Sequence, residues 1–84
     1  MDEVKDFSWA LQALKTDYKV CRNGWNGKGM YLFIENPTML KDRPHDESEF
    51  ERLPYIMMKT ADNFLVPWLA SQTDILAEDW NIVK

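Results

Sequence analysis

Two segments of the sequence combine a tryptophan with several hydrogen-bonding side chains. Residues 23–30 read Asn-Gly-Trp-Asn-Gly-Lys-Gly-Met, and residues 64–74 end in Pro-Trp-Leu-Ala-Ser-Gln-Thr-Asp. A flat apolar ring beside amide and hydroxyl groups suits a nucleobase or nucleoside, because the ring stacks on the base and the polar groups orient it. The alternative is that Trp25 and Trp68 fill a thin core or a subunit interface, where tryptophan is common. The residues by themselves leave both interpretations open.

The residue types that usually catalyse reactions form no competent set. The single cysteine, Cys21, falls in an expected strand where a small thiol packs well, and the single histidine, His45, has no evident orienting partner. Asp74 with Glu78 or Asp79 is a possible acid–base pair, but acids near a helix start are expected as complements of the helix dipole. We therefore predict no catalytic residues, and no metal site or cofactor, because one thiol and one imidazole do not make a zinc site.

All three glycines lie within 24–29, where the backbone can adopt positive φ and approach a ligand closely. The segment lacks the spacing of a Walker phosphate-binding loop. It is the most unusual stretch of the sequence.

The composition limits the class of protein. Eighty-four residues make one domain, 1–84, which buries only about 60–65% of its unfolded surface, so a thin core and oligomerisation are expected. A net charge of −4 with no run of basic residues argues against nucleic acid as a partner. The lone cysteine, the lack of a membrane-length apolar run and the lack of a signal-like start predict a cytoplasmic protein without membrane association.

The elements that must position the two tryptophan segments follow from periodicity and turn residues. We expect an amphipathic helix within 6–16, capped by Ser8, and a strand over 18–22 that runs into the turn at Asn23-Gly24. Residues 30–35 form an apolar run that predicts a buried strand. The charged stretch 38–53 is expected to be an excursion with a brief helix near 47–52.

The C-terminal half predicts a hairpin, a short helix and a last strand. Strands are expected over 55–60 and 64–69, joined by a turn at 62–63, with Pro67 requiring a sheet edge, a bulge or a strand end. A capping box begins at Ser71 with Asp74 at the third helical position, and 80–83 forms a final strand. The expected fold class is α+β: a small antiparallel sheet packed with an N-terminal helix and a short second helix, in an oligomer.

Three runs of the sequence carry a resemblance to a known family. They are Gly-Trp-Asn-Gly-Lys-Gly-Met-Tyr-Leu (24–32), Leu-Pro-Tyr-Ile-Met-Met-Lys-Thr-Ala-Asp (53–62) and Val-Pro-Trp-Leu-Ala-Ser-Gln-Thr-Asp-Ile-Leu-Ala-Glu-Asp-Trp (66–80). Together with the helix over 7–15, they resemble the Thoeris anti-defence 2 sponge family of phages and bacteria. The likeness covers nearly the whole chain except 36–52, where members differ in length and content.

The resemblance implies a protein that defeats bacterial immunity by sequestering a nucleotide messenger. Thoeris makes a cyclised isomer of ADP-ribose from NAD, and sponges of this type bind the messenger without degrading it. The family is described as a homotetramer with ligand pockets between protomers, and some relatives also take up cyclic dinucleotides. The resemblance thus favours ligand binding as the role of the two tryptophans.

The resemblance also assigns roles to positions of this sequence. Trp25 and Trp68 are expected to stack on bases, and Met30 to line the pocket wall. The remaining positions divide into hydrogen-bonding groups for the adenine edge or ribose (Asn26, Ser71, Gln72, Thr73, Asp74) and cations for the pyrophosphate (Arg22, Lys28). Two rival functions stay open: an interaction module that binds a host protein through the same aromatics, and a nucleotide hydrolase.

Overall fold

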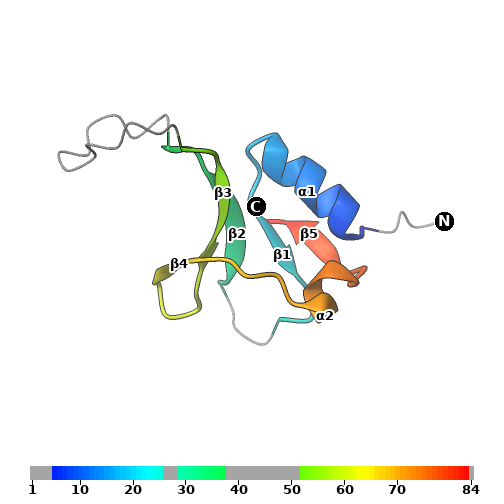
Figure 1. The fold of residues 1–84 in the computed structure, drawn as a ribbon. Coiled ribbons are helices and arrows are strands. Elements are labelled where there is room, and N and C mark those ends of the chain that lie inside the picture. Colours follow the sequence, from blue (N-terminus) through cyan, green and yellow to red (C-terminus); the bar gives the residue numbers. More distant parts are fainter. Residues whose placement is uncertain (1–4, 26–28, 38–51, 84) are drawn as a thin grey trace.

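An antiparallel sheet with one helix packed against it forms the body of the protein (Figure 1). The computed structural model describes residues 5–25, 29–37 and 52–83. In these ranges the elements follow in the order α1 (Phe7–Lys15), β1 (Val20–Arg22), β2 (Tyr31–Glu35), β3 (Tyr55–Lys59), β4 (Leu65–Pro67), α2 (Gln72–Ile75) and β5 (Trp80–Ile82). The strands lie in the order β4-β3-β2-β1-β5, and every pairing between them is antiparallel. The predicted α+β class, with its N-terminal helix and short second helix, is confirmed.

Helix α1 is capped by Asp6, two residues before the predicted cap. The carboxylate of Asp6 accepts a hydrogen bond from the Trp9 amide at 3.0 Å, which is the contact of an N-cap residue with the third helical residue. Ser8 lies inside the helix, so its prediction as the cap is wrong. The apolar periodicity is confirmed, because α1 buries Ala10 and Leu14 toward the sheet.

Strand β1 is shorter than predicted because the end of α1 uses the preceding residues. The amides of Asp17 and Tyr18 donate to the carbonyls of Leu14 and Ala13, at 3.0 Å in both cases, and Asp17 has a positive φ of 69°. These amides close the last turn of α1. The strand therefore starts at Val20 rather than at residue 18.

The predicted hairpin is present, with β4 at one edge of the sheet. Asn63 takes a φ of 70° in the turn, and the Thr60 amide donates to the Phe64 carbonyl at 2.8 Å. Pro67 ends β4, as its missing amide hydrogen requires. The strand expected over 64–69 ends at Pro67, one of the outcomes that the proline allowed, and β5 forms the opposite edge.

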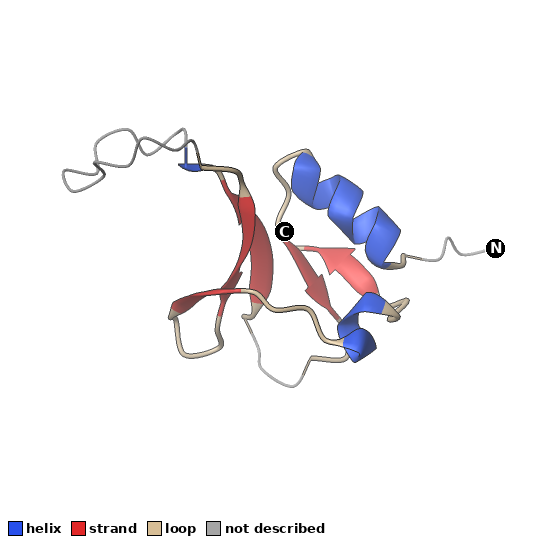
Figure 2. Cartoon of the chain, viewed as in Figure 1, coloured by secondary structure: helices blue, strands red, loops and turns tan. Residues whose placement is uncertain are grey.

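The buried core of the described residues lies on the α1 side of the sheet. Its residues come from α1, β1, β2 and β5: Ala10, Ala13, Leu14, Val20, Leu32 and Trp80. Figure 2 shows that α1 covers β1 and β5, while β3 and β4 curve away from it. In β2 only Leu32 is fully buried, so the expectation of a buried strand over 30–35 is wrong for its other residues. Tyr31 and Phe33 are on the face opposite Leu32, because successive side chains alternate, and Ile34 on the face of Leu32 lines a cavity.

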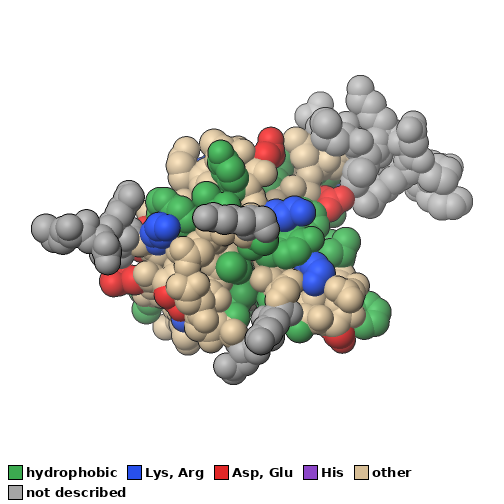
Figure 3. All heavy atoms as spheres, turned by 180° about the vertical axis from the view of Figure 1, so that it is seen from behind, with side chains coloured by type: hydrophobic (Ala, Val, Ile, Leu, Met, Phe, Trp, Pro, Cys, Tyr) green, Lys and Arg blue, Asp and Glu red, His purple; other side chains and the backbone are tan. Residues whose placement is uncertain are grey.

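The described residues show neither a membrane-spanning helix nor a basic surface on the face seen in Figure 3. None of their helices is long and apolar enough to cross a membrane. On the face shown in Figure 3, Lys and Arg side chains are separated by apolar and neutral atoms, so the described residues form no continuous basic surface there. A helix was also predicted near 47–52, and residues 47–51 of it lie outside the described residues.

Candidate functional site

The two tryptophan segments, far apart in the sequence, meet at one hydrogen bond. The indole Nε1 of Trp25 donates to Asp74 Oδ1 at 3.1 Å. Trp25 follows the turn after β1, and Asp74 lies in α2, so the bond joins one end of the sheet to the short helix. The structure thus brings together residues that the sequence could only group by composition.

Four aromatic rings pack around this junction, and we call them the aromatic cluster: Phe7, Trp25, Trp68 and Trp80. The fully buried Trp80 is central, with ring centroids 5.5 Å from Trp25, 5.6 Å from Phe7 and 6.2 Å from Trp68. Trp25 and Trp68 both meet Trp80 edge to face, the geometry that ring quadrupoles favour. Both rings remain partly exposed while they pack on the core. The two interpretations of these tryptophans are therefore compatible.

Arg22 connects α2 with the start of β5. Its NH1 donates to Asp74 Oδ1 at 2.7 Å, and its Nε donates to Asp79 Oδ1 at 2.8 Å. The side chains of Arg22 and Asp74 are each 15% exposed and that of Asp79 is 32% exposed, so these ion pairs are partly shielded from water. The guanidinium predicted to meet a pyrophosphate already binds two carboxylates of its own chain.

These contacts set the protonation of the two acids. Burial by itself raises the pKa of Asp74, but hydrogen bonds from Arg22 and Trp25 outweigh it, and the pKa is lowered overall. The hydrogen bond from Arg22 lowers the pKa of Asp79, and the Gly24 amide adds to this effect. The pKa of Arg22 is raised by the same two acids. Both carboxylates are thus ionised at neutral pH, which suits ion pairing and not donation of a proton.

The start of α2 is capped as predicted. The hydroxyl of Ser71 accepts a hydrogen bond from the Asp74 amide at 3.1 Å. Gln72 and Thr73 occupy the exposed first turn. Of the candidate polar residues in this segment, Ser71 is engaged in the cap, Asp74 is engaged with Arg22 and Trp25, and Gln72 and Thr73 face solvent.

The glycine-rich segment is described only at its two ends. Asn26 and Lys28 lie outside the described residues, and Met30 is half-buried just before β2. At the far end Gly29 adopts a φ of 80°, and its carbonyl accepts a hydrogen bond from Lys59 Nζ at 2.8 Å. The positive φ expected of this segment is therefore present at Gly29.

Three residues at this junction were absent from the predicted site: Phe7, Asp79 and Trp80. Trp80 is one of four tryptophans in 84 residues, but the sequence pattern predicts only that it begins the last strand. For Asp79 the sequence suggests a catalytic acid or a complement of the helix dipole, but not an ion pair with Arg22. Its pairing with Arg22 joins positions 57 apart in sequence, which no local pattern reveals.

Cys21 and the other potential metal ligands form no reactive centre in the described residues. Burial raises the pKa of the Cys21 thiol, with a further contribution from the charge of Asp79, which disfavours the nucleophilic thiolate. Within 5–25, 29–37 and 52–83, no group of three or more His, Cys, Asp and Glu side chains is placed to hold a metal ion.

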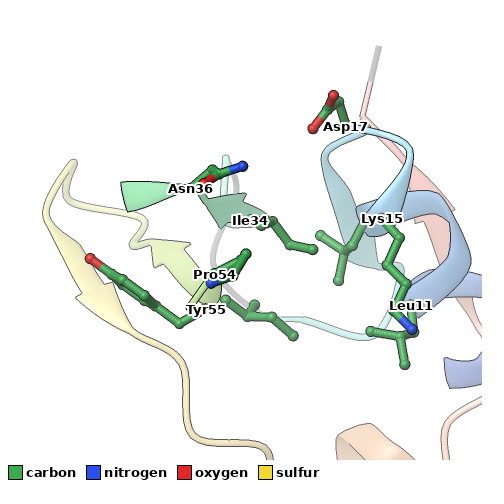
Figure 4. A pocket seen from close by; sticks show the side chains of 9 residues that line it. Leu11, Lys15, Asp17, Ile34, Asn36, Pro54 and Tyr55 are labelled. Carbon is green, nitrogen blue, oxygen red and sulfur yellow. The ribbon is translucent and has the colours of Figure 1, made fainter. Parts of the chain in front are cut away.

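A well-formed cavity among the described residues lies elsewhere. It has a volume of about 440 Å³ and opens between α1 and the ends of β2 and β3 (Figure 4). Leu11, Ile34 and Ile56 form its apolar walls, with Lys15 and Asp17 at the α1 side. None of the predicted ligand residues lines it. The predicted site is a surface junction in the single chain rather than an enclosed pocket.

Together the fold and the junction define a small α+β domain with partly exposed tryptophans held beside ionised, internally paired acids. This arrangement is suited to binding. The chain belongs to the Thoeris anti-defense 2-like domain family, whose model matches residues 5–83. It is 45% identical over 89 residues to Thoeris anti-defense 2 of Bacillus phage SP01, with both chains covered completely. The predicted family is confirmed, and membership supports a role in phage anti-defence.

Proposed function

We propose that this protein is a non-enzymatic sponge that sequesters a cyclic ADP-ribose-derived messenger of the Thoeris system. The observation that carries the proposal is the full-length family match, within which both tryptophan segments meet through the Trp25–Asp74 hydrogen bond. Partly exposed indole rings beside hydroxyl and amide groups match the chemistry of an adenine nucleotide. The paired, ionised acids favour a binder over a hydrolase.

In this proposal the site residues divide by chemistry. Trp25 and Trp68 stack on the base, Met30 adds apolar wall, and Arg22 and Lys28 attract the pyrophosphate. The polar contacts come from Asn26, Ser71, Gln72, Thr73 and Asp74. Since Arg22 is neutralised by Asp74 and Asp79, its attraction for a phosphate is weaker than that of an unpaired arginine.

We also propose that the sponge is a homo-oligomer, a tetramer, in the host cytoplasm, with pockets completed between protomers. The support is the apolar surface along β4 and its connection to α2, where Phe64 is 65% exposed and Leu69 is 92% exposed. Exposed apolar side chains next to one another are typical of protein interfaces. A second copy on this surface would lie beside Trp68 and enclose a junction that is open in one chain.

Titration calorimetry of the purified protein against cyclic ADP-ribose isomers and cyclic dinucleotides tests the ligand. Recovery of the ligand after heat denaturation tests the mechanism. Tight binding with intact ligand recovered supports a sponge, and a cleaved product establishes a hydrolase. Capture of a host protein with no nucleotide binding supports the interaction module.

A tryptophan substitution assigns the site. Trp68→Ala is expected to abolish binding while the protein stays folded, because its ring supplies a stacking face that alanine lacks. Trp9→Ala is the matched control, since Trp9 is a half-buried tryptophan outside both segments. Affinity unchanged in Trp68→Ala would assign Trp68 to the core only.

A further inference from the structure

Asp79 lies outside both tryptophan segments, immediately before β5, yet it holds the first of them in place. Its carboxylate accepts hydrogen bonds from the Gly24 amide and from Arg22 Nε, both at 2.8 Å, and its carbonyl accepts from the Asn23 amide at 3.0 Å. We propose that Asp79 is a positioning residue that, together with Arg22 and Asp74, fixes Trp25 for ligand stacking. The inference rests on the proposed nucleotide-binding function.

Asp79 first positions Trp25 through hydrogen bonds to the backbone of the preceding turn. Asp79 binds two consecutive amides, those of Asn23 and Gly24, and Trp25 follows directly. A Cβ atom at position 24 would lie 2.9 Å from Asp79 Oδ2 and 3.2 Å from Arg22 NH2, so a side chain there would displace the carboxylate or the guanidinium. The position of Asp79 therefore determines where the Trp25 backbone lies.

Asp79 also positions Trp25 through a chain of side-chain contacts. Arg22 binds Asp79 and Asp74 at once, and Asp74 Oδ1 accepts the Trp25 indole hydrogen bond at 3.1 Å. The ring plane of Trp25 is further set by its 80° packing on Trp80. The backbone end and the indole nitrogen of Trp25 are thus fixed by two acids that share one arginine, and hydrogen bonds in such a partly shielded network are stronger than at an open surface.

Asp79 is not itself suited to contact the ligand. Both of its carboxylate oxygens accept hydrogen bonds from protein donors, and its negative charge repels a pyrophosphate. We therefore expect Asp79 to affect affinity by orienting Trp25 and not by direct contact with the ligand. Gly24 also contributes to positioning Trp25, because its amide donates to Asp79 and not to a ligand.

Asp79→Asn tests this role, with Glu78→Gln as the matched control. Each substitution removes one negative charge, at adjacent positions, but Glu78 is exposed. In the ligand-free protein, ¹H–¹⁵N NMR is expected to show the Trp25 indole and Gly24 amide resonances displaced in Asp79→Asn and unmoved in Glu78→Gln. Calorimetry is expected to show affinity for the bound cyclic ADP-ribose isomer weakened about tenfold in Asp79→Asn, the size of loss typical of groups that orient a binding residue.

A double-mutant cycle with Trp25→Phe separates positioning from general damage. Phenylalanine keeps a stacking ring but removes the indole donor, so Asp79→Asn is expected to cost less affinity in the Trp25→Phe background than in the wild type. Equal losses in both backgrounds, or an unmoved Trp25 resonance in Asp79→Asn, would overturn the inference. Should the wild-type protein bind no nucleotide, the proposed function fails, whereas the NMR comparison still decides whether Asp79 holds Trp25.

Discussion

The two halves of the sheet differ in how they are stabilised. On the side of α1, β1 and β5, the core includes Leu14, Val20 and Trp80 without exposed surface. On the other side, β3 and β4 contain no fully buried residue, and β4 is exposed along its whole length. The first half contains the buried core, while the second leaves apolar side chains such as Leu65 and Val66 exposed. The aromatic cluster lies where the halves meet: Phe7, Trp25 and Trp80 belong to the first half, and Trp68 directly follows β4.

Trp80→Ala is expected to have the largest effect on stability. Loss of a fully buried indole that contacts three other rings should lower the free energy of unfolding by about 3–5 kcal/mol, measured by urea denaturation. This is a large part of the stability of a small domain. A loss below 1 kcal/mol would show that the cluster is not the centre of the core.

A pair of facing residues compares the two halves directly. Leu32 on β2 and Met58 on β3 are opposite each other in the sheet, but only Leu32 is fully buried. Leu32→Ala should lower the free energy of unfolding by about 2–5 kcal/mol, and Met58→Ala by roughly half as much or less. Equal losses in denaturation experiments would mean that another surface covers β3.

The stability of the junction should depend on pH at the acidic end. The pKa values of Asp74 and Asp79 are lowered by folding, so the ion pairs with Arg22 stabilise the native state above the unfolded pKa of about 4. This stabilisation is lost as the pH falls through the lower, folded pKa values. In urea titrations at pH 7 and pH 3, Arg22→Gln should lose less stability between the two pH values than the wild type. An identical loss would place the acid sensitivity elsewhere.

The smallest effect on folding is expected for Leu69→Ser. With Leu69 92% exposed in the single chain, the substitution should change the free energy of unfolding of dilute protein by less than about 0.5 kcal/mol. If the apolar surface between β4 and α2 joins protomers, light scattering should nevertheless show a smaller assembly. An unchanged mass would remove Leu69 from the proposed interface.

Local chemistry made much of this fold predictable. Pro67 limited β4 to a sheet edge, a bulge or a strand end, the Ser71 capping box predicted the start of α2, and the apolar period of α1 predicted its buried face. Each of these signals acts within a few residues. The predicted cap of α1 was wrong because Asp6 and Ser8 are both capping residue types, and only the course of the chain chooses between them. The extent of β1 was missed because the closing turn of α1 uses residues that have strand propensity.

The sequence by itself therefore determined the fold class and the family, and it singled out the two tryptophan segments. Only the tertiary structure decided what those segments contact. Arg22 forms ion pairs with two acids of its own chain, and the Trp25 indole donates a hydrogen bond to Asp74. Asp79 accepts a hydrogen bond from a turn that lies more than 50 positions away in the sequence. The physical reason is that the ion pairs and ring contacts of this junction join residues brought together by sheet order, a long-range property that no spacing within a single segment encodes.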